Sequence, residues 1–151
     1  MDDAFAWPDA AHAVRVTLRL LVAAVLGGAI GMEREITGKA AGLRTHMLVA
    51  LGAAVFTLAP HEAGMQIADL SRVFQGLIAG IGFLGAGAIL KLPADQRIVG
   101  LTTAASIWLT AAIGSAVAVG ALWLPVLAVT LALVILLVVR RFTGPESSER
   151  A

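Results

Sequence analysis

Long apolar segments alternate with short polar stretches along this chain of 151 residues. The apolar segments run over residues 16–32, 43–59, 73–92, 99–119 and 121–139. A membrane-spanning helix needs about 20 predominantly apolar residues, and each segment is close to that length. The pattern therefore predicts an all-α, polytopic bundle of about five transmembrane helices.

The boundary between the last two segments rests on turn-forming residues alone, because no charge separates them. It is marked by Gly114, Gly120 and the Trp123–Leu124–Pro125 sequence. Proline is common in the first turn of a helix, and tryptophan is enriched at membrane interfaces. The alternative is four spans, with the last two segments forming one kinked helix. At 1.5 Å per residue, a helix of roughly 41 residues is too long to cross the membrane once. We therefore favour five spans.

The composition supports a membrane protein. Hydrophobic residues make up 59% of the chain and charged residues 14%, against about 45–50% and about 25% in soluble domains. A net charge of +1 argues against nucleic-acid binding, which needs a basic face. The absence of cysteine excludes disulfides and thiolate metal sites. The first eight residues hold Asp2 and Asp3 and no basic residue, unlike a signal peptide, so we expect the first segment to be a spanning helix.

Basic residues predict the orientation. With five spans, eight of them fall on one side of the membrane and three on the other. The larger group is Arg34, Lys39, Arg44, Lys91, Arg97, Arg140, Arg141 and Arg150, and the smaller is Arg15, Arg19 and Arg72. The positive-inside rule then predicts a periplasmic amino terminus and a cytoplasmic carboxyl terminus in a bacterial inner membrane. Residues 1–142 form the predicted transmembrane domain, and the polar, turn-rich residues 143–151 are expected to be a short disordered cytoplasmic tail.

An internal similarity appears when the chain is shifted by 58 positions. Residues 42–45 (Gly-Leu-Arg-Thr) fall on residues 100–103 (Gly-Leu-Thr-Thr), and Leu26–Gly27 fall on Leu84–Gly85. This register predicts a tandem repeat of a helical hairpin, with both copies in the same orientation and any site at their interface. The alternative is that glycine-rich membrane helices resemble one another by composition.

Glycines recur at helical spacing in the first and third segments. The candidates for helix packing are Gly27, Gly31, Gly76, Gly80, Gly82, Gly85 and Gly87. Helices in lipid associate through close backbone approach, which small residues permit. The third segment could instead be locally unwound around a cavity, or could form a dimer interface.

Charged residues gather where the first segment ends and the second begins. The candidates are Glu33, Arg34 and Glu35, followed by Arg44 and Thr45, with His46 next to them. Glu33 and Arg44 are expected to face each other across a glycine-containing loop and to form a bidentate ion pair. This cluster is either a gate or cation site, with Glu33 or Glu35 supplying oxygen ligands, or an ion pair that anchors the loop.

Further polar candidates lie in the third and fourth segments. They are Gln75, Thr102, Thr103 and Ser106. Hydroxyls in lipid usually bond to their own backbone or to a neighbouring helix; the alternative is a polar lining of a path. His12, His46 and His61 lie apart in the sequence, and no enzyme motif is present. We therefore expect no enzyme and no cofactor. A divalent cation is compatible with the carboxylates, but the spacing identifies no metal ligands.

Three blocks carry a resemblance to a known family. Residues 31–35 with 39–46, residues 80–89, and residues 100–108 resemble the signatures of the MgtC/SapB family. The resemblance implies an inner-membrane protein of about five spans that supports growth at low magnesium and, in pathogens, survival inside phagocytes. Some members of the family act by restraining the membrane ATP synthase, and direct magnesium transport has also been suspected. This chain resembles a short form without the cytoplasmic carboxyl-terminal domain of many members, and it has Thr102 where some members have Asn. Both departures argue against the role directed at the ATP synthase.

We therefore expect a non-enzymatic inner-membrane protein linked to magnesium limitation or stress, which acts by contacting or regulating other membrane proteins. The alternative is a small transport or ion-handling protein for Mg²⁺-type ions. The expected partners are the lipid bilayer and another membrane protein or a second copy, and not nucleic acid. A cavity lined by Glu33, Arg44 and Thr102–Thr103 would favour transport. A closed polar cluster with a flat, glycine-lined outer face would favour contact.

Overall fold

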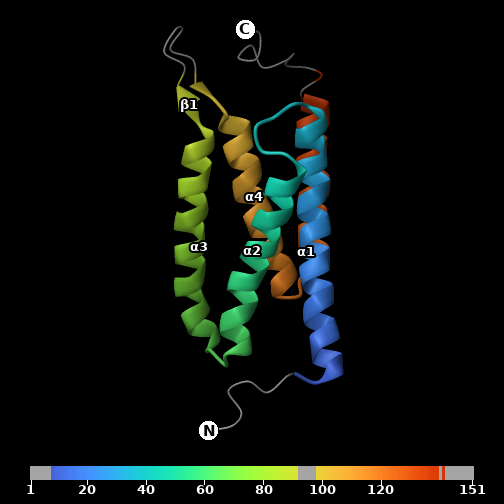
Figure 1. The fold of residues 1–151 in the computed structure, drawn as a ribbon, viewed down its shortest axis with the longest axis vertical. Helices are drawn as coiled ribbons and strands as arrows, with labels where there is room; N and C mark the ends of the chain where they lie inside the picture. Colours follow the sequence, from blue (N-terminus) through green and yellow to red (C-terminus); the bar gives the residue numbers. More distant parts are fainter. Residues whose placement is uncertain (1–7, 92–97, 140, 142–151) are drawn as a thin grey trace.

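The computed structural model describes residues 8–91, 98–139 and 141. The described chain forms five α-helices and one short hairpin (Figure 1). The helices are α1 (Ala10–Ile36), α2 (Leu43–Glu62), α3 (Ile67–Ala88), α4 (Leu101–Ala118) and α5 (Trp123–Val134), and α5 continues into a π-helical turn, η1 (Ile135–Val139). The strands β1 (Leu90–Lys91) and β2 (Ile98–Val99) pair antiparallel between α3 and α4, an element that the apolar pattern did not predict. The predicted all-α helix bundle is confirmed.

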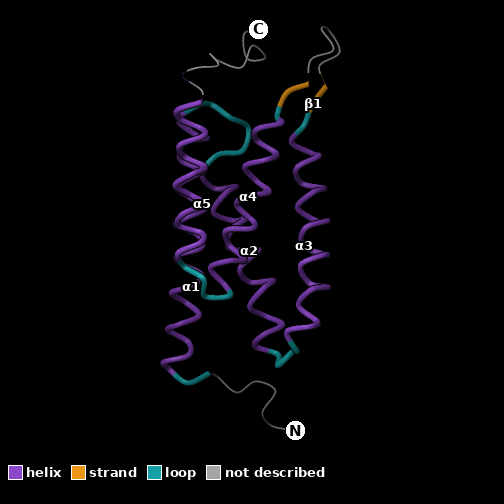
Figure 2. The backbone as a smooth tube through the Cα atoms, turned by 180° about the vertical axis from the view of Figure 1, so that it is seen from behind, coloured by secondary structure: helices purple, strands orange, loops and turns teal. Residues whose placement is uncertain are grey.

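The helices alternate in direction along the long axis of the molecule (Figures 1 and 2). Helices α1, α3 and α5 run one way, and α2 and α4 run the other. Helix α3 lies at one edge of the bundle and α1 at the other, with α2 and α4 between them (Figure 1). Small side chains such as Ala23 of α1 and Ala50 and Ala54 of α2 are fully buried, which lets neighbouring helices lie close together.

Four of the helices, α1 to α4, are long and apolar enough to cross a membrane, and the apolar stretch Trp123–Val138 is shorter. The chain is therefore a multi-pass membrane protein. The alternative of one kinked helix over the last two segments is wrong, because α4 ends before Gly120, whose φ of 90° lies in the left-handed region that favours glycine. Gly114 does not contribute to this break, since it lies buried inside α4.

The two hairpins α1–α2 and α3–α4 share one register. Helices α2 and α4 begin at Leu43 and Leu101, 58 positions apart, each after a glycine. Gly27 packs against the backbone of His46, and Gly85 packs against Ala104, its counterpart at the same shift. The contacts follow the predicted repeat, and both hairpins point the same way (Figure 1).

Two polar contacts tie helix ends together at the end of the bundle where α1 begins. Nη1 of Arg19 donates to the carbonyl oxygen of Ala118, at the end of α4, over 3.0 Å. Nε2 of His12 lies 2.5 Å from Oε2 of Glu62, at the end of α2.

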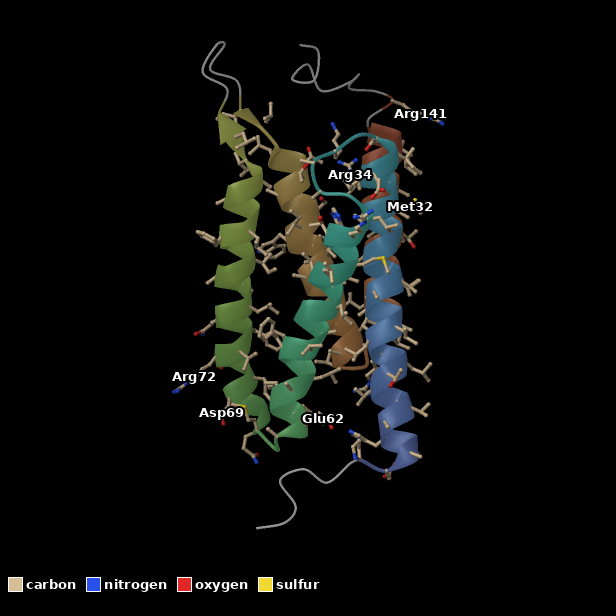
Figure 3. All side chains as sticks on the ribbon, in the orientation of Figure 1. Met32, Arg34, Glu62, Asp69, Arg72 and Arg141 are labelled. Carbon is tan, nitrogen blue, oxygen red and sulfur yellow. The ribbon has the colours of Figure 1, made fainter. Side chains whose placement is uncertain are left out.

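The predicted division of basic residues matches the ends of the bundle where the structure describes them. Arg34 and Arg141 lie near one end and Arg72 near the other (Figure 3). The predicted tail, residues 143–151, lies outside the described residues, as do Arg97, Arg140 and Arg150.

Candidate functional site

The buried polar cluster comprises Glu33 and Arg34 of α1, His46 of α2, and Thr103 and Ser106 of α4. Each of these residues is less than a tenth exposed. They meet because α1 ends where α2 and α4 begin, at the end of the bundle where Arg34 is labelled in Figure 3. The cluster therefore joins three helices at one level.

Glu33 and Arg34 form a closed ion pair inside the protein. Both Nε and Nη2 of Arg34 lie 2.5 Å from Oε2 of Glu33, and the two side chains are 3% (Arg34) and 6% (Glu33) exposed. Removing two charges from water is costly, so each needs the other in place. Oε1 of Glu33 is buried and has no hydrogen-bond partner among the described residues.

His46 connects α2 to α4. Its Nδ1 lies 2.9 Å from the carbonyl oxygen of Gly42, and its Nε2 lies 3.1 Å from Oγ of Ser106. A carbonyl oxygen can only accept, so Nδ1 carries the proton, and Nε2 of the neutral ring accepts from the Ser106 hydroxyl. The same hydroxyl lies 2.8 Å from the carbonyl oxygen of Thr103, so its proton has two acceptors within reach.

Glu35 fixes the loop that leads into α2. Its Oε2 accepts a hydrogen bond from the backbone N–H of Leu43 over 2.7 Å, which satisfies a donor that the first turn of a helix leaves free. A Cβ at Gly42 would lie 2.6 Å from the same oxygen. A side chain at position 42 would therefore displace the Glu35 carboxylate from this cap.

The predicted pairing of Glu33 with Arg44 is wrong. The partner of Glu33 is the adjacent Arg34, while Arg44 is exposed at the start of α2. The direction of a side chain at a helix end depends on how the helix is rotated about its own axis. In this bundle Arg44 of α2 points outward, whereas Arg34 of α1 points inward. The pair of adjacent residues lies within α1, and the side chain that holds the loop is that of Glu35, through its hydrogen bond to Leu43.

The remaining polar candidates are spread over the bundle. Thr45 is exposed, and Thr102 is half-buried beside the cluster. Gln75 is exposed on α3 and does not belong to the cluster. A cavity of about 420 Å³ between α2, α3 and α4 is lined by Thr45 and Thr103, among mostly apolar residues, and not by Glu33, Arg44 or Thr102.

The candidate glycines fall into two groups. A Cβ at Gly27 would lie 2.7 Å from the carbonyl oxygen of His46, and one at Gly31 would lie 2.8 Å from Cα of Leu43, so α1 and α2 require both. A Cβ at Gly85 would make only ordinary contact with Ala104, at 3.6 Å. Nothing lies within 4 Å of a Cβ built at four others, all in α3: Gly76, Gly80, Gly82 and Gly87. Within the described chain, this part of α3 has no helix packed on its glycines.

The sequence reasoning gave two residues no role in the site. His46 was placed next to Arg44 and Thr45 but was not chosen as a site candidate, yet it is fully buried at the centre of the cluster. Gly114 was read as a boundary, but a Cβ there would lie 2.1 Å from the carbonyl oxygen of Ala50. No sequence spacing pointed to that contact between α2 and α4.

No three histidine or acidic side chains lie close enough to hold a metal ion in the part of the chain that the structure describes. The only buried carboxylate of the cluster is already neutralised by an arginine. A cation placed beside Glu33 would be repelled by the guanidinium of Arg34.

Comparison with known proteins gives a consistent result. The model of the MgtC family matches residues 20–144. The chain is 42% identical over 133 residues to the Escherichia coli K12 protein named "Putative magnesium transporter YhiD", covering 83% of this chain and 61% of that protein. It is 45% identical over 119 residues to Protein SrpB of Synechococcus elongatus, covering 72% of this chain and 65% of that protein.

A third relative is Protein MgtC of Salmonella typhimurium, which is 45% identical over 97 residues, covering 64% of this chain and 40% of that protein. The chain thus spans less than two thirds of the length of these relatives. No solved structure matches it.

Proposed function

The chain belongs to the MgtC family, and we propose that it is a non-enzymatic protein of the bacterial inner membrane that supports adaptation to low magnesium by contacting another membrane protein. The magnesium link rests on the family and on the names of its relatives. The mode of action rests on the site. The polar cluster is closed, and among the described residues nothing lies within 4 Å of a Cβ built at Gly76 or Gly80 of α3.

The observation that carries the proposal is the bare glycine face of α3, formed by Gly76 and Gly80. These two residues are four apart and fall on one side of the helix at 3.6 residues per turn, and nothing lies within 4 Å of a Cβ at either of them. In lipid, such a surface lets the backbone of a second helix approach closely. The α1–α2 contact through Gly27 and Gly31 shows that this chain already uses glycines in that way.

The experiment is a matched pair of glycine substitutions. Gly80→Leu is expected to abolish support of growth at low magnesium in a strain that depends on this protein, because the side chain blocks helix approach. Gly52→Leu is the control: Gly52 of α2 also has nothing within 4 Å but lies outside the face, and growth should be kept. Equal amounts of each variant in the membrane must be confirmed by immunoblot. Normal growth with Gly80→Leu would contradict the proposal.

Transport is the second candidate, and one observation favours it. Oε1 of Glu33 is a buried carboxylate oxygen without a hydrogen-bond partner among the described residues, and such an atom is a candidate ion ligand. A flux assay with the purified protein in liposomes distinguishes these two functions. If the protein acts only by contacting another membrane protein, we expect no flux of Mg²⁺, Mn²⁺ or Ca²⁺. A flux that Glu33→Gln alters would establish transport.

The proposed orientation has a periplasmic amino terminus and a cytoplasmic carboxyl terminus. It is supported by the basic residues at the end of the bundle that carries Arg34 and Arg141 (Figure 3). A reporter enzyme fused after Arg150 should be active only in the cytoplasm.

A further inference from the structure

A groove between α3 and α4 is lined almost entirely by apolar side chains. Its volume is about 250 Å³. Its walls include Phe74, Ile78 and Ile81 of α3 and Trp108, Ala112 and Ser115 of α4. The lining residues on each helix recur at intervals of three and four, so one face of each helix forms a wall. We call this the α3–α4 groove.

Ser115 is the one polar side chain of the α3–α4 groove. It is 8% exposed, and its hydroxyl has no hydrogen-bond partner among the described residues. The hydroxyls of Thr57, Thr110 and Thr130 instead donate to the carbonyl oxygen four residues earlier, at 2.8 to 2.9 Å. A buried hydroxyl without a partner carries a free-energy cost, which a ligand atom would remove.

The position of Ser115 indicates what that ligand atom is. Ser115 lies three residues before Ala118, the last residue of α4, and is therefore close to the edge of the hydrocarbon region. From Ser115 the α3–α4 groove extends seven residues along α4 to Trp108, or about 10 Å at 1.5 Å per residue. One leaflet contributes about 15 Å of hydrocarbon, so the groove follows most of a leaflet inward from its surface.

We propose that the α3–α4 groove binds one acyl chain of a phospholipid, whose ester carbonyl accepts a hydrogen bond from the Ser115 hydroxyl. The ester group joins the acyl chain to the headgroup at the edge of the hydrocarbon region, which is the level of Ser115. The apolar walls bury the hydrocarbon below it. This lipid is distinct from the surrounding bilayer, because it takes a place between two helices.

The first hairpin supplies an internal control. Thr57 stands 58 positions before Ser115, and its hydroxyl is closed onto the carbonyl oxygen of Ala53. Ala50 stands 58 positions before Trp108 and is fully buried. The corresponding space in the first hairpin is therefore filled by close helix packing, and no lipid site is expected there.

The test is native mass spectrometry of the full chain, purified in mild detergent and loaded with phosphatidylethanolamine and phosphatidylglycerol. We expect one phospholipid to stay bound per chain. Ala112→Phe, which fills the α3–α4 groove from an exposed position, should remove it. Ala105→Phe, the same change at an exposed position seven residues earlier on α4 and outside the groove lining, should leave it bound.

The hydrogen bond has its own test. Ser115→Ala should weaken retention of the phospholipid about fivefold, the usual effect of losing one hydrogen bond, while Thr57→Ala should leave it unchanged. Circular dichroism and gel filtration confirm that each variant is folded. A chain that retains no phospholipid, or an Ala112→Phe variant that is folded and retains it as the wild type does, would overturn the proposal.

Discussion

In the first hairpin, a Cβ at Gly27 would lie 2.6 Å from Cβ of Ala50, whereas a Cβ at Gly85, the same position of the second hairpin, has its nearest neighbour at 3.6 Å. The two hairpins therefore share a register and differ in how closely their helices approach. His46 faces Gly27 and takes part in the buried polar cluster, while its counterpart Ala104 carries no polar group. The two helices of the first hairpin pack tightly on each other, whereas in the second hairpin α4 is part of the core and α3 lies more loosely beside it.

This difference indicates that the two hairpins, although they share a register, have different structural roles. In the first hairpin, close packing and buried hydrogen bonds hold three helices at fixed positions. In the second, α3 contacts mainly α4, its glycines are bare, and the α3–α4 groove opens beside it. The proposed partner contact and the proposed lipid site both fall on this looser copy.

The largest expected effect comes from breaking the buried ion pair of the first hairpin. Arg34→Leu leaves Glu33 buried without a counter-charge and should lower the free energy of unfolding by about 3–5 kcal/mol. Arg44→Leu, at an exposed arginine, should change it by about 0.5 kcal/mol or less. The double variant Glu33→Leu/Arg34→Leu should recover much of the loss. Denaturation in detergent micelles measures all three, and equal losses for the two arginines would refute the assignment of the pair.

A smaller effect distinguishes the packing of the two hairpins. Gly27→Ala should destabilise the protein by about 1–3 kcal/mol, because the added Cβ overlaps the backbone of His46. Gly85→Ala places the same group in ordinary contact with Ala104 and should be neutral within about 0.5 kcal/mol. The thermal midpoint of each variant in the same detergent gives the comparison. If both variants lose the same stability, the second hairpin is packed as tightly as the first.

The smallest expected effect on the free energy of unfolding comes from removing a buried hydroxyl, and it differs in direction between the two hairpins. Without added phospholipid, Thr57→Ala removes a satisfied hydrogen bond and should cost about 1 kcal/mol. Ser115→Ala removes a buried hydroxyl that has no partner among the described residues and should leave stability unchanged or slightly raised. Paired unfolding curves of the delipidated variants measure both, and a clear loss of stability with Ser115→Ala would show that its hydroxyl has a partner within the protein.

Much of the architecture follows from the apolar pattern. Segment lengths predicted the five helices, and the shift of 58 predicted that Gly85 occupies the place of Gly27. Both predictions depend on the helical repeat of the backbone, which leaves a periodic pattern of apolar and small residues in the sequence. The β1–β2 hairpin was not predicted, because two strands of two residues each leave no periodic signal.

The contacts of the site were harder to predict. Choosing between Arg34 and Arg44 as the partner of Glu33 required the rotation of α1 and α2 about their axes, which an apolar pattern does not define for helices that are hydrophobic on most sides. The burial of His46 and the contact of Gly114 with Ala50 depend on α2 meeting α4, a pairing of segments far apart in sequence. Sequence reasoning identified the right end of the molecule but gave no role to His46 at the centre of the cluster.

The hydrogen bond from Arg19 to the carbonyl oxygen of Ala118 has a consequence for biosynthesis. A ribosome produces Arg19 about a hundred residues before its acceptor, so α1 must enter the bilayer with a guanidinium that has no acceptor on α4. That charge has to remain among lipid phosphates until the fourth helix arrives. Docking of α4 on α1 is thus a step that follows the insertion of both helices, in which a carbonyl at the end of the fourth helix replaces the headgroups around a side chain of the first.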